Sequence, residues 1–278
     1  MPDLLKAAVL GIVQGLTEFL PVSSTGHLVL LEKAFGLSQD RLGIPFDSAL
    51  HLGTLLAILV FFWATILGLI RAWLTSVRER RWDLSTDSRL AWLIAIATVP
   101  AGIVGFLFES DIENKLRQPV TIAVMLAVFG LVLLIAEVQA SGKLHASQIG
   151  FKGAVFVGLA QAIAVIPGVS RSGITMSAGL FARLDRQQAA TFAFLLSAPV
   201  VAGAGLKGLY DALKAAHNGL LGREDLAFFA VGFAMAALTG YVTIGVLLRF
   251  LRGHSFVPFV AYRFGLAMVV VGIVLLTL

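Results

Sequence analysis

The sequence predicts an all-α polytopic membrane protein, built as an inverted-topology repeat with two re-entrant helix pairs and six transmembrane helices. Three observations predict this fold class. Hydrophobic residues make up 58% of the 278 residues and charged residues only 13%, about half the share of a typical globular domain. Long uncharged stretches recur along the chain. Two further apolar regions are broken by polar segments that carry similar motifs.

Residues 7–31 form the first broken apolar region, which Glu18 and the segment from Pro21 to Gly26 interrupt. Neither half is long enough to cross a hydrocarbon core about 30 Å thick. Irregular backbone at membrane depth occurs only inside protein or beside a water-filled cavity. We therefore expect a re-entrant helix pair over residues 4–31. The alternative is an interfacial helix that leaves Glu18 at the surface.

Three uncharged stretches of 19 to 23 residues follow, and each is long enough to cross the membrane once as a helix. These predicted spans are residues 48–70, 90–108 and 118–136. A second broken apolar region comes next, because the segment from Pro167 to Gly173 divides residues 153–182. By the same argument, a second re-entrant pair is expected over residues 151–182.

The two polar breaks resemble each other at a fixed distance along the chain. Val22-Ser23-Ser24-Thr25-Gly26 matches Val169-Ser170-Arg171-Ser172-Gly173 at an offset of 147 residues, and Gly11-Ile12-Val13-Gln14 matches Gly158-Leu159-Ala160-Gln161 at the same offset. We interpret this as an internal duplication, with a first repeat over residues 1–147 and a second over residues 148–278. Three spans separate the breaks, so the second pair should enter from the opposite face and meet the first near the midplane.

The last three spans are predicted at residues 187–206, 226–248 and 257–277, where Arg263 is the one charge in the final stretch. Lys and Arg in short loops indicate the orientation. The alternate loops that include 71–89 carry 11 of these residues, whereas those on the other side carry 8. This bias predicts a cytoplasmic 71–89 loop and both termini outside.

Composition excludes several classes of function. The net charge is +5, but the charges lie in short loops, which favours membrane topology and anionic lipid over nucleic acid as the explanation. The chain has no cysteine, which excludes a disulfide framework, a zinc–thiolate site and a cysteine nucleophile. The N-terminal segment lacks a strongly basic start, so no cleavable signal peptide is expected.

The first break carries several candidate catalytic side chains. Gln14 and Glu18 are four residues apart and share one helix face. A carboxylate inside a membrane is a candidate functional group by default, so Glu18 is expected to bind a divalent cation or act as a general base, with the Gln14 carbonyl on the same ion. His27 suits proton transfer near neutral pH. The hydroxyls of Ser23, Ser24 and Thr25 are candidates for attack or phosphate binding, or for a simple helix cap.

The second break carries Arg171 among small residues. A guanidinium at this depth needs an anion, and its fork suits phosphate oxygens. The residues around it, among them Ser170, Ser172 and Thr175, leave backbone N–H groups free at a helix N-terminus, which also binds anions. The alternative is an internal salt bridge to Glu18. Together the breaks suit phosphoryl transfer, and burial in a membrane implies a substrate with an apolar tail and a phosphate head.

Other polar residues are given weaker roles. Asp47 and His51 are four residues apart at the start of a span, but no glutamate lies near them in the sequence, so they are left outside the site. Arg263, beside Tyr262, is expected to snorkel to the interface or to pair with another group. The run from Ala202 to Gly205 is interpreted as a close helix-packing face.

The chain resembles the undecaprenyl-pyrophosphate phosphatase family that is linked to bacitracin resistance. Three segments carry the resemblance: Gln14–His27 (QGLTEFLPVSSTGH), Pro167–Thr175 (PGVSRSGIT) and Phe256–Arg263 (FVPFVAYR). The first two motifs are long and specific, and the likeness extends over essentially the whole chain. It implies an inverted repeat in the bacterial inner membrane, with an active site that opens to the outer face.

The resemblance also implies an activity. The family hydrolyses undecaprenyl pyrophosphate to the monophosphate with a divalent cation, Mg²⁺ or Ca²⁺, which recycles the lipid carrier for peptidoglycan synthesis and confers bacitracin resistance. Many members have Glu at the position of Gln14, so Glu18 is expected to be the main ligand or base here. The expected roles are catalysis by Glu18, Ser24, His27 and Arg171, cation binding by Glu18 and Gln14, and substrate binding by Gln14, Ser23, Thr25, Ser170, Ser172 and Thr175.

Two alternative functions are weighed against this one. Broken helices in inverted repeats are also typical of transporters, so a lipid flippase could use the same phosphate clamp. Glu18, Ser24 and His27 discriminate between the two, because moving a headgroup needs neither a nucleophile nor a base. A purely structural membrane subunit leaves two buried charges unexplained. The sequence leaves open whether serine or water attacks and whether a homodimer forms.

Overall fold

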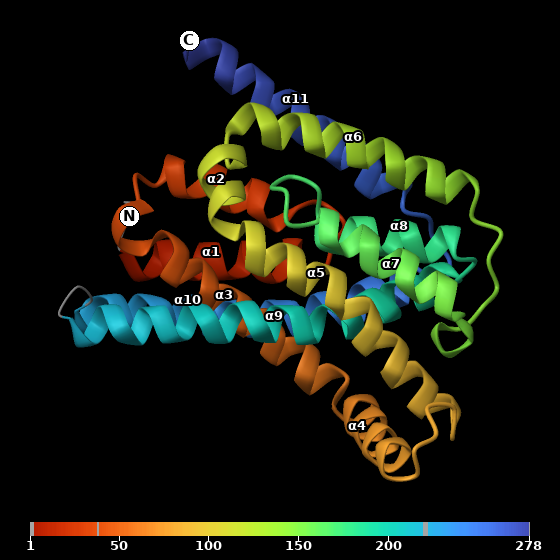
Figure 1. Ribbon diagram of the computed structural model, residues 1–278. Coiled ribbons are helices and arrows are strands. Elements are labelled where there is room, and N and C mark those ends of the chain that lie inside the picture. Colours follow the sequence, from red (N-terminus) through yellow and green to blue (C-terminus); the bar gives the residue numbers. More distant parts are fainter. Residues whose placement is uncertain (1–2, 38, 219–221, 278) are drawn as a thin grey trace.

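The computed structural model describes residues 3–37, 39–218 and 222–277. The described residues form eleven α-helices and one 3₁₀ turn, and they contain no β-strand beyond one isolated bridge (Figure 1). The prediction of an all-α chain is therefore confirmed for these residues. The elements are α1 (Asp3–Thr17), α2 (Ser24–Ala34), α3 (Gln39–Phe61), α4 (Trp63–Arg78), α5 (Thr86–Leu116), α6 (Pro119–Val138), η1 (Ala146–Gln148), α7 (Phe151–Ile163), α8 (Arg171–Phe181), α9 (Arg186–His217), α10 (Arg223–Phe250) and α11 (Val257–Thr277).

Five helices of the described chain, α5, α6, α9, α10 and α11, contain segments long and apolar enough to cross a membrane. The bent pair α3–α4 raises this number to six if the pair crosses once. Large apolar side chains on these helices point outward, among them Phe106, Val246 and Leu276. Such an apolar outer surface needs lipid rather than water around it. The chain is a multi-pass membrane protein, as predicted.

The predicted span over residues 48–70 is not one continuous helix. Helix α3 ends at Phe61, α4 begins at Trp63, and the two are bent by 81°. Phe62 is buried at the bend, with its ring centroid 5.0 Å from that of Phe61 and 6.5 Å from that of Phe194 on α9. The burial of this aromatic ring favours the bend. Neither proline nor glycine marks the position, so hydropathy alone does not reveal it.

Both predicted helix–break–helix segments form. Residues 18–23 separate α1 from α2, and residues 164–170 separate α7 from α8. A serine ends each break and caps the next helix: the Ser23 side chain accepts from the Gly26 amide, and the Ser170 side chain accepts from the Gly173 amide. Both serines have a φ of 73°, which is uncommon for a residue with a side chain. The two breaks therefore share one unusual backbone conformation at matched positions.

The glycines of the upstream match also occupy similar environments. A Cβ atom on Gly11 would lie 2.5 Å from the carbonyl oxygen of Gly232 on α10. A Cβ atom on Gly158 would lie 2.5 Å from the carbonyl oxygen of Ala97 on α5. Each glycine lets a short helix of a broken pair approach the backbone of a long helix.

Helix α6 packs beside α11, and α3 packs beside α9 (Figure 1).

We expect Gly11→Ala and Gly158→Ala each to destabilise the protein by about 1–3 kcal/mol, because the added methyl group forces two backbones apart. Thermal unfolding in detergent measures the effect. Gly102→Ala is the control, since a Cβ atom there meets nothing within 4 Å. An unchanged unfolding temperature for both variants would contradict the close packing described here.

Several helix ends and loops contact one another through hydrogen bonds. The Arg186 Nε atom lies 2.9 and 3.1 Å from the two carboxylate oxygens of Glu137. Glu137 also accepts from the Phe256 amide at 3.3 Å, and Arg89 donates to the carbonyl of Ile149 at 3.5 Å. The end of α6 therefore lies beside the start of α9 and the residue before α11, and the start of α5 lies beside the segment before α7.

Candidate active site

A single arginine on α11 joins the two polar breaks. Arg263 is 0% exposed, and its guanidinium donates to five backbone carbonyls. One belongs to Pro21 in the first break, at 3.3 Å, and two belong to Gly168 and Val169 in the second, each at 3.1 Å. The expectation that Arg263 snorkels to the interface is therefore wrong, because the breaks supply enough carbonyl acceptors to satisfy it inside the protein.

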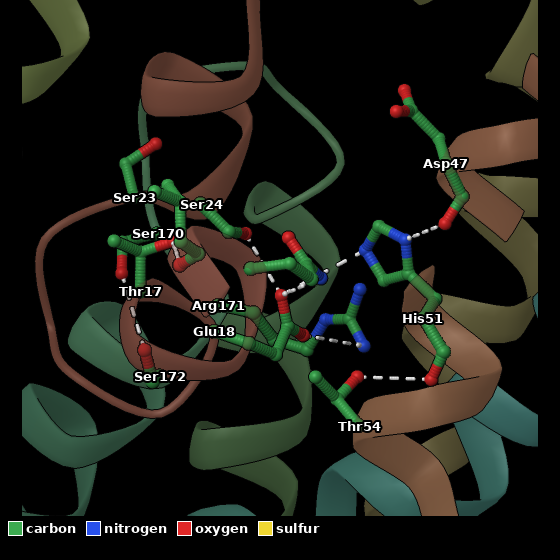
Figure 2. Close-up of polar contacts among 12 residues, drawn as sticks. Thr17, Glu18, Ser23, Ser24, Asp47, His51, Thr54, Ser170, Arg171 and Ser172 are labelled. Carbon is green, nitrogen blue, oxygen red and sulfur yellow. Dashed lines mark hydrogen bonds and ion pairs between the residues drawn. The ribbon is translucent and has the colours of Figure 1, made fainter. Parts of the chain in front are cut away.

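Glu18 lies at the centre of the polar cluster, directly after α1. Its side chain is 8% exposed, so the alternative of a surface carboxylate is wrong. The Glu18 Oε2 atom accepts hydrogen bonds from Ser24 Oγ at 2.8 Å and from Gln14 Nε2 at 3.2 Å (Figure 2). The predicted pairing of Gln14 with Glu18 is confirmed. The Ser24 hydroxyl therefore donates a hydrogen bond to a carboxylate that can accept its proton, as activation of a serine nucleophile requires.

Arg171 reaches the same carboxylate from the second break. It is the first residue of α8, and its Nη1 atom lies 3.7 Å from Glu18 Oε1. The salt bridge considered from the sequence is therefore present, but it is longer than the roughly 2.7–2.9 Å of a charge-assisted hydrogen bond. The Nη1 atom is buried and hydrogen-bonds to no described residue. A buried guanidinium nitrogen without a hydrogen bond is suited to an incoming anionic oxygen.

His51 is the site residue that sequence reasoning missed. Helix α3 carries it to within 3.7 Å of Glu18, measured from its Nε2 atom to Oε2 (Figure 2). Its Nδ1 atom lies 2.8 Å from the carbonyl oxygen of Asp47, one helical turn earlier. The spacing of Asp47 and His51 was the available sequence signal. Only the packing of α3 beside α1 brings a glutamate close to them.

His27 is held by two contacts that do not include Ser24. Its Nδ1 atom lies 2.7 Å from the carbonyl oxygen of Ser23, and its Nε2 atom lies 2.6 Å from the Tyr262 hydroxyl. A carbonyl can only accept, so Nδ1 carries a hydrogen, and in a neutral ring Nε2 accepts from tyrosine. The two rings are stacked, with centroids 5.6 Å apart. Tyr262 thus contacts a predicted catalytic residue, which its sequence position did not indicate.

The remaining predicted residues form the walls of the breaks. Ser172 Oγ donates to the Leu20 carbonyl at 3.0 Å and so links the second break to the first. Thr175 Oγ1 donates to the Arg171 carbonyl at 2.7 Å within α8. Ser23 and Ser170 are helix caps, as described above, and Thr25 is half-buried in the first turn of α2. Their predicted role in substrate binding stays a prediction.

A divalent cation needs several oxygen ligands, and the sequence predicts Glu18 and Gln14 as two of them. Among the described residues, no group of three His, Asp or Glu side chains could hold a metal ion by itself. Gln14 is 0% exposed, and its Oε1 atom accepts no hydrogen bond from any described group. The Gln14 Nε2 atom faces Glu18, and turning the amide by 180° would present Oε1 beside the carboxylate, as a Mg²⁺-type site completed by substrate phosphates requires. The cation and the role of Glu18 and Gln14 as its ligands stay predictions.

The fold and this cluster define a class: a multi-pass helical membrane protein with a buried serine–carboxylate pair beside an arginine. Residues 7–269 match the family described as bacitracin resistance protein BacA, and the chain belongs to that family. It is 47% identical to the undecaprenyl-diphosphatase of Rubrobacter xylanophilus over 99% of this chain and 100% of that one. It is 44% identical to the undecaprenyl-diphosphatases of Thermodesulfovibrio yellowstonii, over 97% of each chain, and Geotalea daltonii, over 94% of each. The family and the enzyme class expected from the motifs are confirmed.

Proposed function

We propose that the chain is an integral-membrane phosphatase that hydrolyses undecaprenyl pyrophosphate to undecaprenyl phosphate and inorganic phosphate. The observation that carries this proposal is the 2.8 Å hydrogen bond from Ser24 to Glu18, beside Arg171. The names of the relatives supply the substrate. A flippase would need only the arginine clamp, so the serine–carboxylate pair favours hydrolysis over transport.

The chemistry follows from these contacts. Arg171 binds the pyrophosphate oxygens through its Nη1 atom, which makes no hydrogen bond to the described chain. Glu18 accepts a proton as the Ser24 oxygen, or a water held between them, attacks the terminal phosphorus. The bond from that phosphorus to the bridging oxygen breaks, and undecaprenyl phosphate leaves. In the serine route, a water then cleaves the phosphoserine and releases inorganic phosphate. General base catalysis of this kind contributes roughly 10²- to 10⁴-fold.

Other residues support these steps. We propose that His27, whose ring Ser23 and Tyr262 orient, moves a proton at the leaving or attacking oxygen. Glu18 and Gln14 would hold the divalent cation, Mg²⁺ or Ca²⁺, which when bound neutralises charge on the pyrophosphate. The capping hydroxyls of both breaks keep helix N-termini directed toward the substrate phosphates.

We also propose the inverted-repeat architecture expected from the sequence. The two repeats, residues 1–147 and 148–278, are inverted, and the pairs α1–α2 and α7–α8 are re-entrant. The shared φ of Ser23 and Ser170 supports this, as does the like packing of Gly11 and Gly158. The excess of Lys and Arg in the loops after α4, α6, α8 and α10 supports a cytoplasmic position for those loops. The active site then opens to the outer face and both termini lie outside.

The proposed reaction fits a role in the cell envelope. Its product is the monophosphate form of a lipid carrier, and regenerating it would recycle that carrier for peptidoglycan synthesis. Higher activity would remove the pyrophosphate that bacitracin sequesters, and so confer resistance.

The test is phosphate release from undecaprenyl pyrophosphate by the full-length protein in detergent, first with Mg²⁺ or Ca²⁺ and then with a chelator. We expect cation-dependent release, reduced about 10²-fold or more in Arg171→Lys, since an ammonium cannot reproduce the guanidinium fork. Arg252→Lys, in an exposed loop, is the matched control. Folded parent protein that binds the substrate but releases no phosphate would overturn the proposal in favour of a flippase. Labelled phosphate trapped on the protein would select the serine route.

A further inference from the structure

Two electron-pair donors near Glu18, the Nε2 atom of His51 and the Oε1 atom of Gln14, accept no hydrogen bond from the described chain, whereas Glu18 Oε2 accepts from Ser24 and Gln14. The Oε2 atom of Glu18 faces His51, whose Nε2 atom is 3.7 Å away, which is too long for a hydrogen bond. The buried Oε1 atom of the neighbouring Gln14 likewise accepts no hydrogen bond from the described chain. Buried acceptors without donors require an explanation in a native structure.

The second contact of the His51 ring shows which of its nitrogens carries the hydrogen. Its Nδ1 atom lies 2.8 Å from the carbonyl oxygen of Asp47, and a carbonyl can only accept, so the ring hydrogen is on Nδ1. A neutral imidazole then presents the Nε2 lone pair toward the Glu18 carboxylate. Two electron-rich atoms in this position repel each other unless a proton or a metal cation lies between them.

The surroundings of His51 match those of a metal-binding histidine. Such residues usually donate their other ring N–H to a carbonyl or carboxylate, which fixes the tautomer and the ring orientation. Here the acceptor is the backbone of Asp47, and the Asp47 side chain is itself held by Arg117 at 2.7 Å. His27 differs, because its Nε2 atom already lies 2.6 Å from Tyr262.

We propose that His51 is a third protein ligand of the divalent cation, through Nε2, together with Glu18 and Gln14. The role of this cation in catalysis rests on the proposed phosphatase function, but its binding does not. The two carboxylate oxygens of Glu18 have different neighbours, since Oε1 faces Arg171 and Oε2 faces His51. The cation therefore need not displace the arginine. An imidazole nitrogen in the donor set makes the site less favourable for Ca²⁺, which takes oxygen ligands, and more favourable for divalent transition metals.

Mn²⁺ alone is the probe, added to the full-length protein in detergent micelles without substrate. Electron paramagnetic resonance gives the dissociation constant, and its pulsed form detects nitrogen bound to the ion. We expect nitrogen coupling in the parent, loss of that coupling in His51→Gln, and a dissociation constant raised about tenfold or more. His27→Gln is the matched control, and it should keep both the coupling and the affinity. Thermal unfolding without metal verifies that each variant is folded.

Each contrary outcome is informative. Nitrogen coupling that persists in His51→Gln, or that disappears in His27→Gln instead, would overturn the assignment, as would Mn²⁺ binding without any nitrogen coupling in the parent. Phosphate release is measured on the same preparations. A parent that hydrolyses the lipid but shows no histidine coupling refutes only this inference. A parent that binds Mn²⁺ through His51 but releases no phosphate refutes only the proposed function.

Discussion

Replacing Glu18 with glutamine is expected to lower the rate of phosphate release by about 10²- to 10⁴-fold, because the amide keeps the shape of the side chain but cannot accept the proton from Ser24. The carboxylate is buried and receives that hydroxyl at 2.8 Å, so no other described group is as well placed to act as the base. Single-turnover phosphate release with saturating substrate measures the chemical step directly. The affinity of the variant for Mn²⁺ should fall as well, since the one carboxylate of the donor set is lost.

The control for this substitution is Glu137→Gln. Glu137 is also a buried glutamate, but it pairs with Arg186 at the end of α6, away from the serine. Its replacement should lower the unfolding temperature, because the side chain loses charge-assisted hydrogen bonds from Arg186. The folded fraction should retain the parental rate. A Glu18→Gln variant with the parental rate would show that the hydrogen bond to Ser24 has no catalytic role.

The sequence predicted much of this fold because membranes restrict the options for a chain. Uncharged stretches of sufficient length must be helices in lipid, and a break that contains proline, serine and glycine must end one helix and begin another. For this reason α5, α6, α9, α10 and α11 were predicted correctly. The proximity of Gln14 and Glu18 could also be predicted, since residues four apart lie on one face of a helix.

The contacts that the sequence did not reveal are those made between distant elements. His51 reaches Glu18 only because α3 packs beside α1, and Tyr262 reaches His27 only through the approach of α11 to α2. The bend at Phe62 has the same origin, since a ring on α9 helps to stabilise it. A single sequence gives periodicity and composition, but it does not give the pairing of helices on which these contacts depend.

Replacing Arg263 with methionine should have the largest effect on stability of any single substitution in the described chain. The guanidinium donates to carbonyls in both breaks and to the carbonyls of Met125 and Leu126 on α6. Methionine fills a similar volume but donates nothing, and a buried carbonyl that loses its donor costs about 1–3 kcal/mol. Partial relaxation lets some carbonyls find other donors. We therefore expect a loss of at least about 3 kcal/mol in the free energy of unfolding, measured by thermal unfolding in detergent.

The conservative and control variants separate hydrogen bonding from charge. Arg263→Lys keeps the charge but has three donors on one nitrogen, which cannot span both breaks, so its stability should lie between those of the parent and the methionine variant. Arg252→Met removes an exposed loop arginine and should change stability by less than about 0.5 kcal/mol. Arg263→Lys should also lose phosphate release more than its stability alone explains, because Arg263 fixes Pro21 and Val169 beside the catalytic groups. If Arg263→Met unfolds at the parental temperature, the two breaks must be held together by other contacts, such as that of Ser172 with Leu20.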